Sequence, residues 1–589
     1  MTRPAAAGLA GCIVLAGACA DAEPDATRQL AGIWEARRDF GPEVRGTMTI
    51  VRSDGEWLAE ISGLTGPASE RDGVIEFDLG EERGSFRGRL EADGSGMTGF
   101  WIQPPTRHNG SRMASPVTLR ADGEGRWRGD VVPFDDAFTF FVVAEPRDDG
   151  SLGAFVRNPE RNFGVFANAD RLERSGDTVR LVGSWFRDTE EEVLSDGLYD
   201  PDRDVFSLNF RGATYEFTRL GEDRESLFYA RGRHPEPWRY EPPPATDDGW
   251  KVGTLAEAGI AIEPLRELIE SVIDPPAESL SAPYVHGMLI ARHGVLVLEE
   301  YFHGFDRETP HDTRSASKSL TSVLVGAAIE AGAPLDASSS VYEVIYGGDP
   351  PLDTDPRALR MTVENLLTMS SGLDCDDRDP ESPGNEDVVQ QQTEEPDWYR
   401  YTMALSMVRE PAETAVYCSI NSNLLGAVLS TATGESVAEL IQRLIADPLQ
   451  IRRYHLFLDP LGRAYMGGGI HWLPRDFMKL GQVMLDGGTW NGRRIVSREW
   501  AARSISPLVE LREKGYGYQW WVMDYPYGEG TVRAFFAGGN GGQVVIGIPD
   551  LDLLVTFYAG NYSDRVMYKI QEEFVPRYVL PAIEQTAER

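Results

Sequence analysis

The segment Ser315-Ala316-Ser317-Lys318 constrains this chain most, because it sets a serine and a lysine one helical turn apart at the start of an apolar run. Of the 57 basic residues only five are lysines, and none of the other four has a serine three positions upstream. Arginine keeps its proton in proteins, whereas a desolvated lysine can lose it, so a site that needs an amine base must keep lysine. The segment therefore predicts a nucleophilic serine, Ser315, with Lys318 as its proton acceptor.

The residues after Lys318 predict a buried helix. They keep the three-four spacing of apolar positions until Gly332 and Pro334: Leu320, Val323, Leu324, Ala327 and Ala328. At the N-terminus of this helix the oriented N–H groups favour an alkoxide on Ser315 and disfavour an ammonium on Lys318. Burial acts in the same direction, so we expect the pKa of Lys318 to be lowered. The alternative is a helix-capping serine followed by a solvated lysine.

The 589 residues are enough for two or three domains. Residues 28–233 carry short alternating runs, such as 84–90 and 137–143, between Asp/Gly turns, which predicts an antiparallel barrel or sandwich. Gly32-Ile33-Trp34 resembles the opening Gly-x-Trp of lipocalin-like barrels. The polar segment 158–162 is predicted to be a turn, with a loop that faces a ligand as the alternative.

A proline-rich stretch at 234–250 predicts an extended, semi-rigid linker and a domain boundary. The second domain, 251–589, begins with strands and ends with strands around a mostly helical middle. We expect an α+β domain in which both ends of the segment build one antiparallel sheet with a helical insertion over one face. The elements that we expect are a helix near 263–273, a hairpin at 287–291 and 295–298, strands at 533–537, 543–548 and 553–558, and a last helix from about Ser563.

Six motifs follow one another in residues 251–589. In order they are Ser315-Ala316-Ser317-Lys318, Leu366-Leu367-Thr368-Met369-Ser370-Ser371-Gly372-Leu373, Tyr417 with Leu424-Leu425-Gly426, Gly467-Gly468-Gly469, Gly515-Tyr516-Gly517-Tyr518-Gln519-Trp520-Trp521, and Gly538-Gly539-Asn540-Gly541-Gly542-Gln543. This succession resembles the serine hydrolases related to class C β-lactamases and penicillin-binding proteins, including esterases and amidases. The resemblance implies an ester or amide hydrolase that acts through an acyl-enzyme on Ser315.

The resemblance also assigns a role to Tyr417, which matches the tyrosine of the family's Tyr-x-Asn motif. Its phenol would relay a proton between Ser315 and the leaving group, and a plain core tyrosine is the alternative. Ser419 stands where the motif has asparagine. We expect the Ser419 hydroxyl to hydrogen-bond Lys318, without the amide donor that the family offers to a substrate carbonyl.

The third family motif, Lys-Thr-Gly or His-x-Gly, is replaced by Ala537-Gly538-Gly539, which has no cation. By alignment the backbone N–H groups of Ser315 and Asn540 would form the oxyanion hole, with Gly539 in a supporting position. Without that cation, neutral acyl esters or amides are expected to be better substrates than β-lactams. Arg314 would restore the charge if it points into the cleft. The alternatives are a D-alanyl peptidase, a β-lactamase, or a non-catalytic binding protein with a degenerate hydrolase domain.

Residues 1–20 are typical of an export signal, with Arg3 before an apolar stretch, Leu9 to Gly17, and a small-residue cleavage site at Ala16-Gly17-Ala18. Cys19 follows a near match to a bacterial lipobox, so a lipid anchor there is an open possibility. No later segment has 18 uninterrupted apolar residues. The sequence predicts an exported protein, periplasmic or anchored to the outer membrane of a bacterium.

Cys375 and Cys418 flank two of the motifs and are expected to pair in an exporting compartment, with two buried free thiols as the alternative. The net charge of −36 argues against nucleic acid or an anionic membrane surface as partner. The eight histidines show no metal-ligand spacing, so no metal or cofactor is predicted. His471 is expected at the rim of the cleft, and the acidic cluster Asp374, Asp376 and Asp377 is expected to be solvated.

Overall fold

The computed structural model describes residues 27–80, 82–106, 110–186, 189–274 and 282–583. The predicted signal segment and Cys19 lie outside these residues. The chain divides into two compact units. The first holds residues up to Ala36, Phe141–Val156 and Phe166–Arg219, and the second holds Arg37–Phe140, Arg157–Val165 and the chain from Leu220 onward.

The first unit is built around a closed barrel. Within the described residues its eight strands follow the order β1 (Gly32–Asp39), β10 (Ala137–Pro146), β11 (Leu152–Arg157), β12 (Ala167–Ser175), β13 (Thr178–Trp185), β14 (Glu192–Asp200), β15 (Val205–Phe210) and β16 (Ala213–Arg219). Trp34 of β1 is fully buried against Phe206, with ring centroids 4.8 Å apart. The predicted barrel is therefore present, although it takes only part of residues 28–233.

The strands between β1 and β10 form a different sheet, which belongs to the second unit. They are β2 (Gly46–Ser53), β3 (Glu56–Ile61), β4 (Leu64–Arg71), β5 (Val74–Asp78), β6 (Ser85–Leu90), β7 (Gly96–Gln103), β8 (Met113–Ala121) and β9 (Arg126–Val131). β8 pairs with β21 (Tyr454–Phe457), so Ala114 lies opposite Leu456. The single β-rich domain expected for residues 28–233 is thus divided, and one of its sheets is hydrogen-bonded to the C-terminal region. Alternation along a strand does not specify its partner, which is why the sequence does not separate the two sheets.

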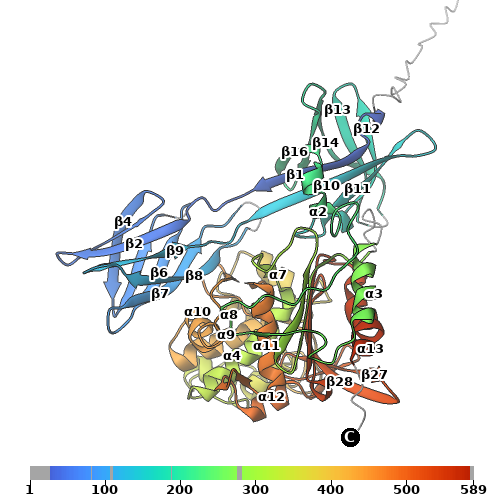
Figure 1. Cartoon of the computed structure of the whole chain (residues 1–589). Helices are drawn as coiled ribbons and strands as arrows, with labels where there is room; N and C mark the ends of the chain where they lie inside the picture. The colour runs from blue at the N-terminus through green and yellow to red at the C-terminus, as the bar shows by residue number, and fades with distance from the viewer. Residues whose placement is uncertain (1–26, 81, 107–109, 187–188, 275–281, 584–589) are drawn as a thin grey trace, which may run out of the picture. The chain divides into compact units, whose positions relative to one another are not determined.

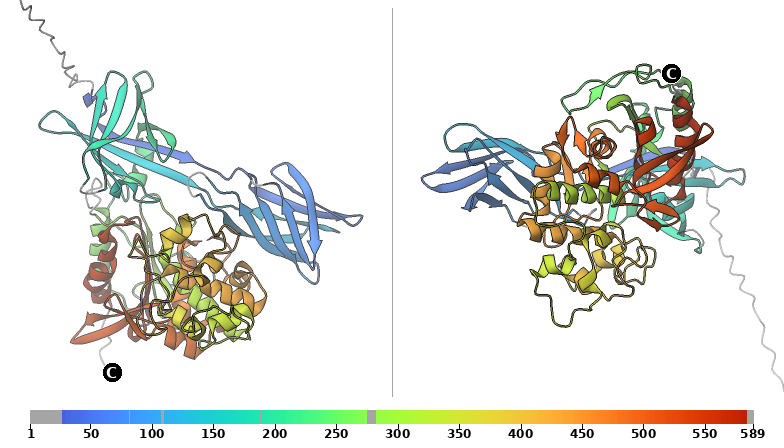
Figure 2. Two further views of the ribbon diagram at one scale, coloured as in Figure 1. Left: turned by 180° about the vertical axis from the view of Figure 1, so that it is seen from behind. Right: turned by 90° about the horizontal axis from the view of Figure 1, so that it is seen from below.

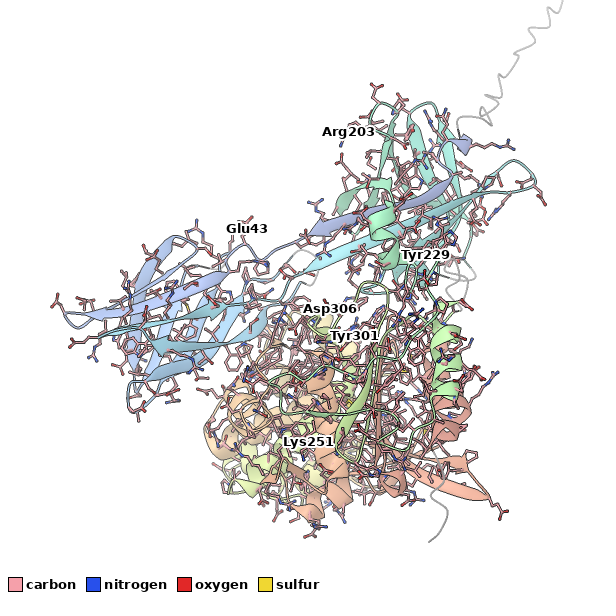
Figure 3. All side chains as sticks on the ribbon, viewed as in Figure 1. Glu43, Arg203, Tyr229, Lys251, Tyr301 and Asp306 are labelled. Carbon is pink, nitrogen blue, oxygen red and sulfur yellow. A yellow bond between two sulfur atoms is a disulfide. The ribbon has the colours of Figure 1, made fainter. Side chains whose placement is uncertain are left out.

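The C-terminal region contains a nine-stranded sheet in the order β17-β19-β18-β30-β29-β28-β27-β26-β25. Its strands are β17 (Lys251–Val252), β18 (Val285–Arg292), β19 (Val295–Tyr301), β25 (Val509–Leu511), β26 (Lys514–Tyr516), β27 (Trp521–Tyr527), β28 (Gly530–Gly539), β29 (Gln543–Ile548) and β30 (Leu553–Ala559). Lys251 and Tyr301 mark the β17 and β19 edge in Figure 3. β18 runs antiparallel to β30, with Ile290 opposite Val555, which confirms the expectation that both ends of this region share one sheet.

Helices cover both faces of this sheet (Figures 1 and 2). The α-helices of the described residues are α2 (Glu225–Phe228), α3 (Ile262–Ile273), α4 (Lys318–Glu330), α5 (Val341–Tyr346), α6 (Val363–Leu367), α7 (Glu386–Gln391), α8 (Trp398–Met403), α9 (Ser419–Thr433), α10 (Val437–Ile441), α11 (Pro474–Leu485), α12 (Arg498–Ser504) and α13 (Leu580–Ala582), and a π-helix, Ile570–Val579, precedes α13. Among them no single helix has the length and apolar character to cross a membrane, and one bent pair, Ser419–Thr433 with Val437–Ala446, meets that test by length and composition only.

α4 is the central helix that the apolar spacing predicts, since it is buried from Lys318 to Ala328. It packs against α9, which is buried over its first eleven residues, Ser419 to Leu429. Gly326 permits the close approach of Trp500, because a Cβ atom at this position would lie 2.4 Å from the indole ring. This packing fixes the start of α4, where Ser315 and Lys318 lie.

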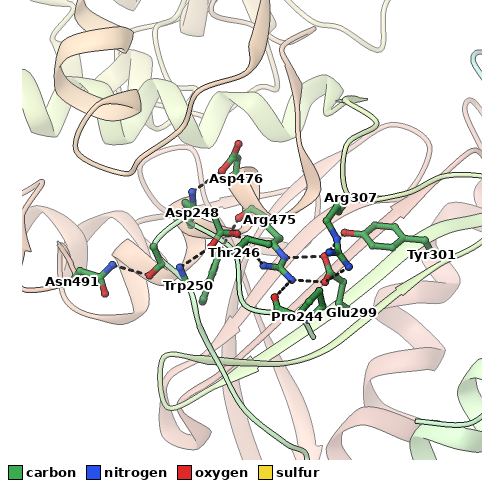
Figure 4. Close-up of polar contacts among 12 residues, drawn as sticks. Pro244, Thr246, Asp248, Trp250, Glu299, Tyr301, Arg307, Arg475, Asp476 and Asn491 are labelled. Carbon is green, nitrogen blue, oxygen red and sulfur yellow. Dashed lines mark hydrogen bonds and ion pairs between the residues drawn. The ribbon is translucent and has the colours of Figure 1, made fainter. Parts of the chain in front are cut away.

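The proline-rich stretch at 234–250 has no helix or strand, and it is held against the second unit rather than standing free (Figure 4). The Arg475 guanidinium donates to the Pro244 carbonyl (3.0 Å) and the Thr246 hydroxyl (2.8 Å) and pairs with Asp248 at 3.1 Å. It also pairs with Glu299 of β19, and both of these side chains are almost fully buried, at 5% and 1% exposure. Residues 234–250, called the strap below, are therefore held in place by contacts with Arg475 of a buried ion pair.

Candidate active site

Ser315 and Lys318 are in direct contact at the start of α4. A 3-10 turn, Arg314–Ser317, leads into the helix and sets Ser315 half-buried above Lys318. Lys318 is 1% exposed, and its Nζ donates to the Ser315 Oγ at 3.0 Å and to the Gly467 carbonyl. The predicted nucleophile and amine therefore lie within hydrogen-bonding distance, which excludes the alternative of a solvated lysine.

The pKa of Lys318 is raised from its ordinary value, and the expectation of a lowered pKa is wrong. Burial does favour the neutral amine, but the tyrosine Tyr417 and the carboxylates Glu386 and Asp377 together outweigh burial. The effects of the helix and of burial can be predicted from the local sequence, whereas these carboxylates lie far along the chain. The other fully buried lysine, Lys479, has a direct ion pair with Asp476 at 2.6 Å, whereas Lys318 donates to a hydroxyl and a carbonyl.

Tyr417 lies beside the amine, one residue before the N-cap of α9. The Lys318 Nζ is 5.1 Å from the centroid of the Tyr417 ring. The ring stacks on Trp521 of β27, with centroids 5.8 Å apart, and the Arg512 guanidinium lies 4.3 Å from its centroid. The structure therefore brings Ser315, Lys318 and Tyr417 together, as the sequence predicts.

β28 ends at Gly539, against the serine turn, and Asn540 follows it. A Cβ atom on Gly539 would lie 2.3 Å from the Thr313 carbonyl oxygen, so only glycine allows the strand to pass this close. The Asn540 side chain is turned toward Ser563, whose N–H donates to the Asn540 Oδ1 at 2.7 Å. Asn540 lines the same cleft as Ser315.

Ser419 does not bond Lys318 as expected. Its hydroxyl and its backbone N–H both donate to Asp377 Oδ2, at 2.6 and 2.9 Å. The Asp377 N–H in turn donates to the Tyr417 carbonyl at 3.0 Å. Asp377, expected to be solvated, is instead half-buried and bonded to residues of the site. Asp377 lies two residues after Cys375, and Cys418 directly follows Tyr417. The predicted disulfide between these cysteines therefore places Asp377 near Tyr417, and Asp377 could have been predicted on this basis.

A second carboxylate, Glu386 at the start of α7, adjoins Asp377. The Glu386 N–H donates to Asp377 Oδ1 at 3.1 Å, and the Glu386 carboxylate accepts from the Tyr465 hydroxyl at 2.6 Å. Burial raises the pKa of Asp377 to about 6, and the negative charge of Glu386 acts in the same direction, while Lys318 and Ser419 oppose it. Glu386 was not predicted as a site residue from the sequence.

Ser315 opens into a cleft of about 590 Å³. Its lining combines glycines, charged groups and aromatic rings: Gly110, Ser111, Arg161, Asp312, Arg314, Ser315, Glu386, Asp387, Gln390, Gln391, Trp398, Phe457, Tyr465, Gly468, Gly469, His471 and Asn540. His471 is therefore part of the lining, as expected, and burial lowers its pKa to about 4. Arg314 also faces this cleft. Arg161, from the segment expected to be a plain turn, is a lining residue that the sequence analysis missed.

The Cys375–Cys418 disulfide is present, as the sequence predicts, with Cα atoms 5.7 Å apart. It links the loop that carries Asp377 to the residue that follows Tyr417. Among the described residues no group of three or more His, Cys, Asp or Glu side chains is arranged to hold a metal ion.

The domain has the site of a serine hydrolase. Its half-buried serine is in contact with a buried lysine, beside the end of an antiparallel strand. The beta-lactamase family model matches residues 281–565. A beta-lactamase domain therefore spans residues 281–565, which agrees with the resemblance that the ordered motifs indicate.

The 6-aminohexanoate-dimer hydrolase of Paenarthrobacter ureafaciens is 27% identical over 258 residues, which cover 40% of this chain and 63% of that protein. The chain thus spans less than two thirds of the length of this relative. Among solved structures, the penicillin-binding protein of Bacillus halodurans is 17% identical, with a TM-score of 0.38, and the match covers 49% of this chain and 95% of that one. Simvastatin synthase of Aspergillus terreus is 16% identical, with a TM-score of 0.43, and covers 54% and 98%.

Proposed function

We propose that this chain is an exported serine hydrolase that cleaves an ester or amide bond through an acyl-enzyme on Ser315, with Lys318 and Tyr417 as the proton-transfer pair. The observation that carries the proposal is the 3.0 Å contact between the Lys318 Nζ and the Ser315 Oγ in a buried setting. A nucleophile bonded to its base is the arrangement that acyl transfer requires.

In the proposed reaction the Ser315 Oγ attacks the substrate carbonyl carbon while the neutral amine of Lys318 takes the hydroxyl proton. The carbonyl oxygen becomes an oxyanion, which the N–H groups of Ser315 and Asn540 bind. Collapse breaks the bond to the leaving group, which receives a proton through the Tyr417 phenol. Water then attacks the acyl-enzyme by the reverse proton path, which releases the acid and restores Ser315.

The resting site holds Lys318 mainly as an ammonium, because its pKa is raised. Lys318 must therefore lose a proton before it accepts one from Ser315. We infer that turnover increases with pH through the neutral range, since the neutral amine is the reactive form.

The substrate is proposed to be a small acyl compound. A cleft of about 590 Å³ is within the range of small-molecule sites, and its aromatic lining, Trp398, Phe457 and Tyr465, suits an extended acyl or amine chain. The Paenarthrobacter relative is named for a dimer of an amino acid, which supports an amide as one candidate.

Export is part of the same proposal. Residues 1–20 have the pattern of a signal, and Cys19 offers a site for a lipid anchor. The Cys375–Cys418 disulfide supports an oxidising compartment such as the periplasm. For the barrel, the Gly32-Ile33-Trp34 opening supports a lipocalin-like, ligand-binding role.

Hydrolysis of p-nitrophenyl butyrate by three variants tests the catalytic proposal. Ser315→Ala should abolish turnover, and Lys318→Arg should lower it about 10²- to 10⁴-fold, because a guanidinium cannot accept the serine proton. Lys251→Arg, at an exposed lysine, is the control and should match the wild type. Wild-type rates in Lys318→Arg would contradict the amine-base mechanism, and an inactive wild type that no ester, amide or β-lactam engages would favour a non-catalytic binding protein.

A further inference from the structure

Two guanidinium groups lie on the wall of the cleft that holds Ser315. Arg161 comes from segment 158–162 of the N-terminal β-rich region, and Arg314 immediately precedes the nucleophile. The Arg161 Nη1 donates to Asp312 Oδ2 at 2.8 Å, and the Arg314 Nε lies 3.0 Å from the same oxygen. A single carboxylate therefore orients two cations beside the reacting serine.

Segment 158–162 is anchored rather than loosely exposed. The Asn158 Oδ1 accepts from the Arg161 N–H at 2.8 Å, and the Asn158 Nδ2 donates to the Thr139 carbonyl at 2.7 Å. The Asn162 Nδ2 donates to the Tyr562 carbonyl at 2.9 Å. Asn158 and Asn162 are both buried, at 1% and 5% exposure. This fixed backbone holds the Arg161 side chain at the cleft.

The two guanidinium groups retain hydrogen-bonding capacity that Asp312 does not use. Each guanidinium carries five N–H donors in a planar fork. The Arg161 and Arg314 side chains are 22% and 31% exposed, while Asp312 is 8% exposed. The Arg314 guanidinium also lies over the Tyr562 ring, 5.1 Å from its centroid, and this cation–π contact helps to hold the guanidinium in place.

Other charged groups lie in and near the cleft beside this pair. Burial raises the pKa of Glu160, in the same segment, to about 7, so it offsets Arg161 only in part. His471 is neutral at pH 7 because burial lowers its pKa to about 4. Buried Asp136 contributes negative charge near Arg161, and Glu386 and Asp387 line the cleft from α7, where Tyr465 engages Glu386.

We propose that Arg161 and Arg314 form an anion subsite that binds a carboxylate carried by the acyl substrate, which rests on the hydrolase function proposed above. This subsite would supply the cation that Ala537-Gly538-Gly539 lacks, and it would do so partly from outside the beta-lactamase-family domain. Arginine pairs with carboxylates through two parallel N–H···O bonds, so the subsite orients the substrate as well as attracting it. The N-terminal region thereby takes part in choosing the substrate.

The test compares kcat/KM for three p-nitrophenyl esters of similar length: the neutral butyrate, the anionic hemiglutarate and the cationic 4-(trimethylammonio)butyrate. The wild type should prefer the anionic ester. Arg161→Gln should lower the anionic-to-neutral ratio about ten- to hundredfold, the size of a lost charge-assisted hydrogen bond. Arg577→Gln, at an exposed arginine of the π-helix Ile570–Val579, is the control and should keep the wild-type ratio.

A wild type that prefers the cationic or the neutral ester would overturn the subsite, as would an Arg161→Gln ratio equal to the wild-type ratio. Fluorophosphonate labelling of Ser315 separates this failure from failure of the hydrolase proposal. If the wild type is labelled but Arg161→Gln keeps the wild-type ratio of anionic to neutral ester hydrolysis, only the subsite is overturned. If the wild type is not labelled, the hydrolase mechanism on which the subsite rests is overturned.

Discussion

The Asp377 carboxylate accepts hydrogen bonds from both the hydroxyl and the backbone N–H of Ser419, at 2.6 and 2.9 Å. The same aspartate donates its own N–H to the Tyr417 carbonyl and contributes to the raised pKa of Lys318. One half-buried aspartate therefore links the position of the tyrosine to the charge of the amine. Ser419 therefore acts together with an aspartate rather than alone.

Replacing Asp377 with alanine should reduce both stability and activity. The two Ser419 donors would lose their acceptor, at a cost of about 1–3 kcal/mol in the free energy of unfolding. Because Ser419, two residues after Tyr417, would lose both of its bonds to this carboxylate, the tyrosine would be held less firmly and kcat/KM should fall about tenfold or more. Asp379→Ala, at an exposed residue of the same loop, is the matched control for thermal unfolding and ester hydrolysis. Equal behaviour of the two variants would contradict the role given to Asp377.

Replacing Glu386 with glutamine should shift the pH profile to lower pH. The negative charge of Glu386 helps to raise the pKa of Lys318, so its removal lowers that pKa and increases the neutral fraction of the amine at pH 7. We expect kcat/KM at pH 7 to rise about two- to tenfold. The measurement is the profile of ester hydrolysis from pH 6 to 10, with exposed Glu394→Gln as control. A profile that coincides with the wild type or moves to higher pH would contradict this electrostatic account.

The sequence predicts the elements of the C-terminal sheet and the contact between Ser315 and Lys318, because each depends on local periodicity or on one helical turn. It does not predict the positions of Asp377 and Arg161, because these depend on partners far along the chain. Arg161 meets Asp312, 151 positions away, and Asp377 meets Ser419, 42 positions away. Local patterns specify a helix or a strand but not which loops meet in space. The carboxylates that raise the pKa of Lys318 come from such loops, and for this reason the sequence predicts the wrong direction for that pKa.

Replacing Arg475 with methionine should destabilise the strap. The change leaves Glu299 buried, at 1% exposure, without its main partner, and breaking a buried ion pair in this way costs about 3–5 kcal/mol. Arg452→Met removes an exposed pair with Asp247 on the same strap, so it should cost at most about 1 kcal/mol. Urea unfolding of both variants measures the difference. A cost for Arg475→Met no larger than that of Arg452→Met would show that the strap is not held by the buried pair.

The buried histidines should make the fold sensitive to mild acid. Burial lowers the pKa of five of them below the ordinary value of 6.5, namely His286, His303, His311, His455 and His471. At pH values between 6.5 and the pKa values of the folded protein, the unfolded chain binds more protons than the folded chain. The contribution of these histidines to the free energy of unfolding is therefore fully present above pH 6.5 and is lost as the pH falls. Each histidine contributes about 1.4 kcal/mol per pH unit in this window. Asp377 and Glu160, whose pKa values are raised, act in the opposite direction.

His286 offers the sharpest test of this acid sensitivity. Both of its ring nitrogens lack a hydrogen-bond partner among the described residues, and its ring stacks on Phe305 with centroids 3.9 Å apart. His286→Phe should therefore lose less stability between pH 7.5 and 5.5 than the wild type, by about 1.4 kcal/mol for each pH unit below 6.5. Exposed His293→Phe is the control. Thermal unfolding with the same pH slope in both variants and the wild type would contradict the account.

The most direct test of the central claim is intact-protein mass spectrometry after reaction with a fluorophosphonate, followed by peptide mapping. The account predicts one adduct on the wild type, located on Ser315, none on Ser315→Ala, and labelling of Lys318→Arg slowed about 10²- to 10⁴-fold. An adduct on a different residue, or equal labelling of Ser315→Ala, would show that Ser315 is not the nucleophile.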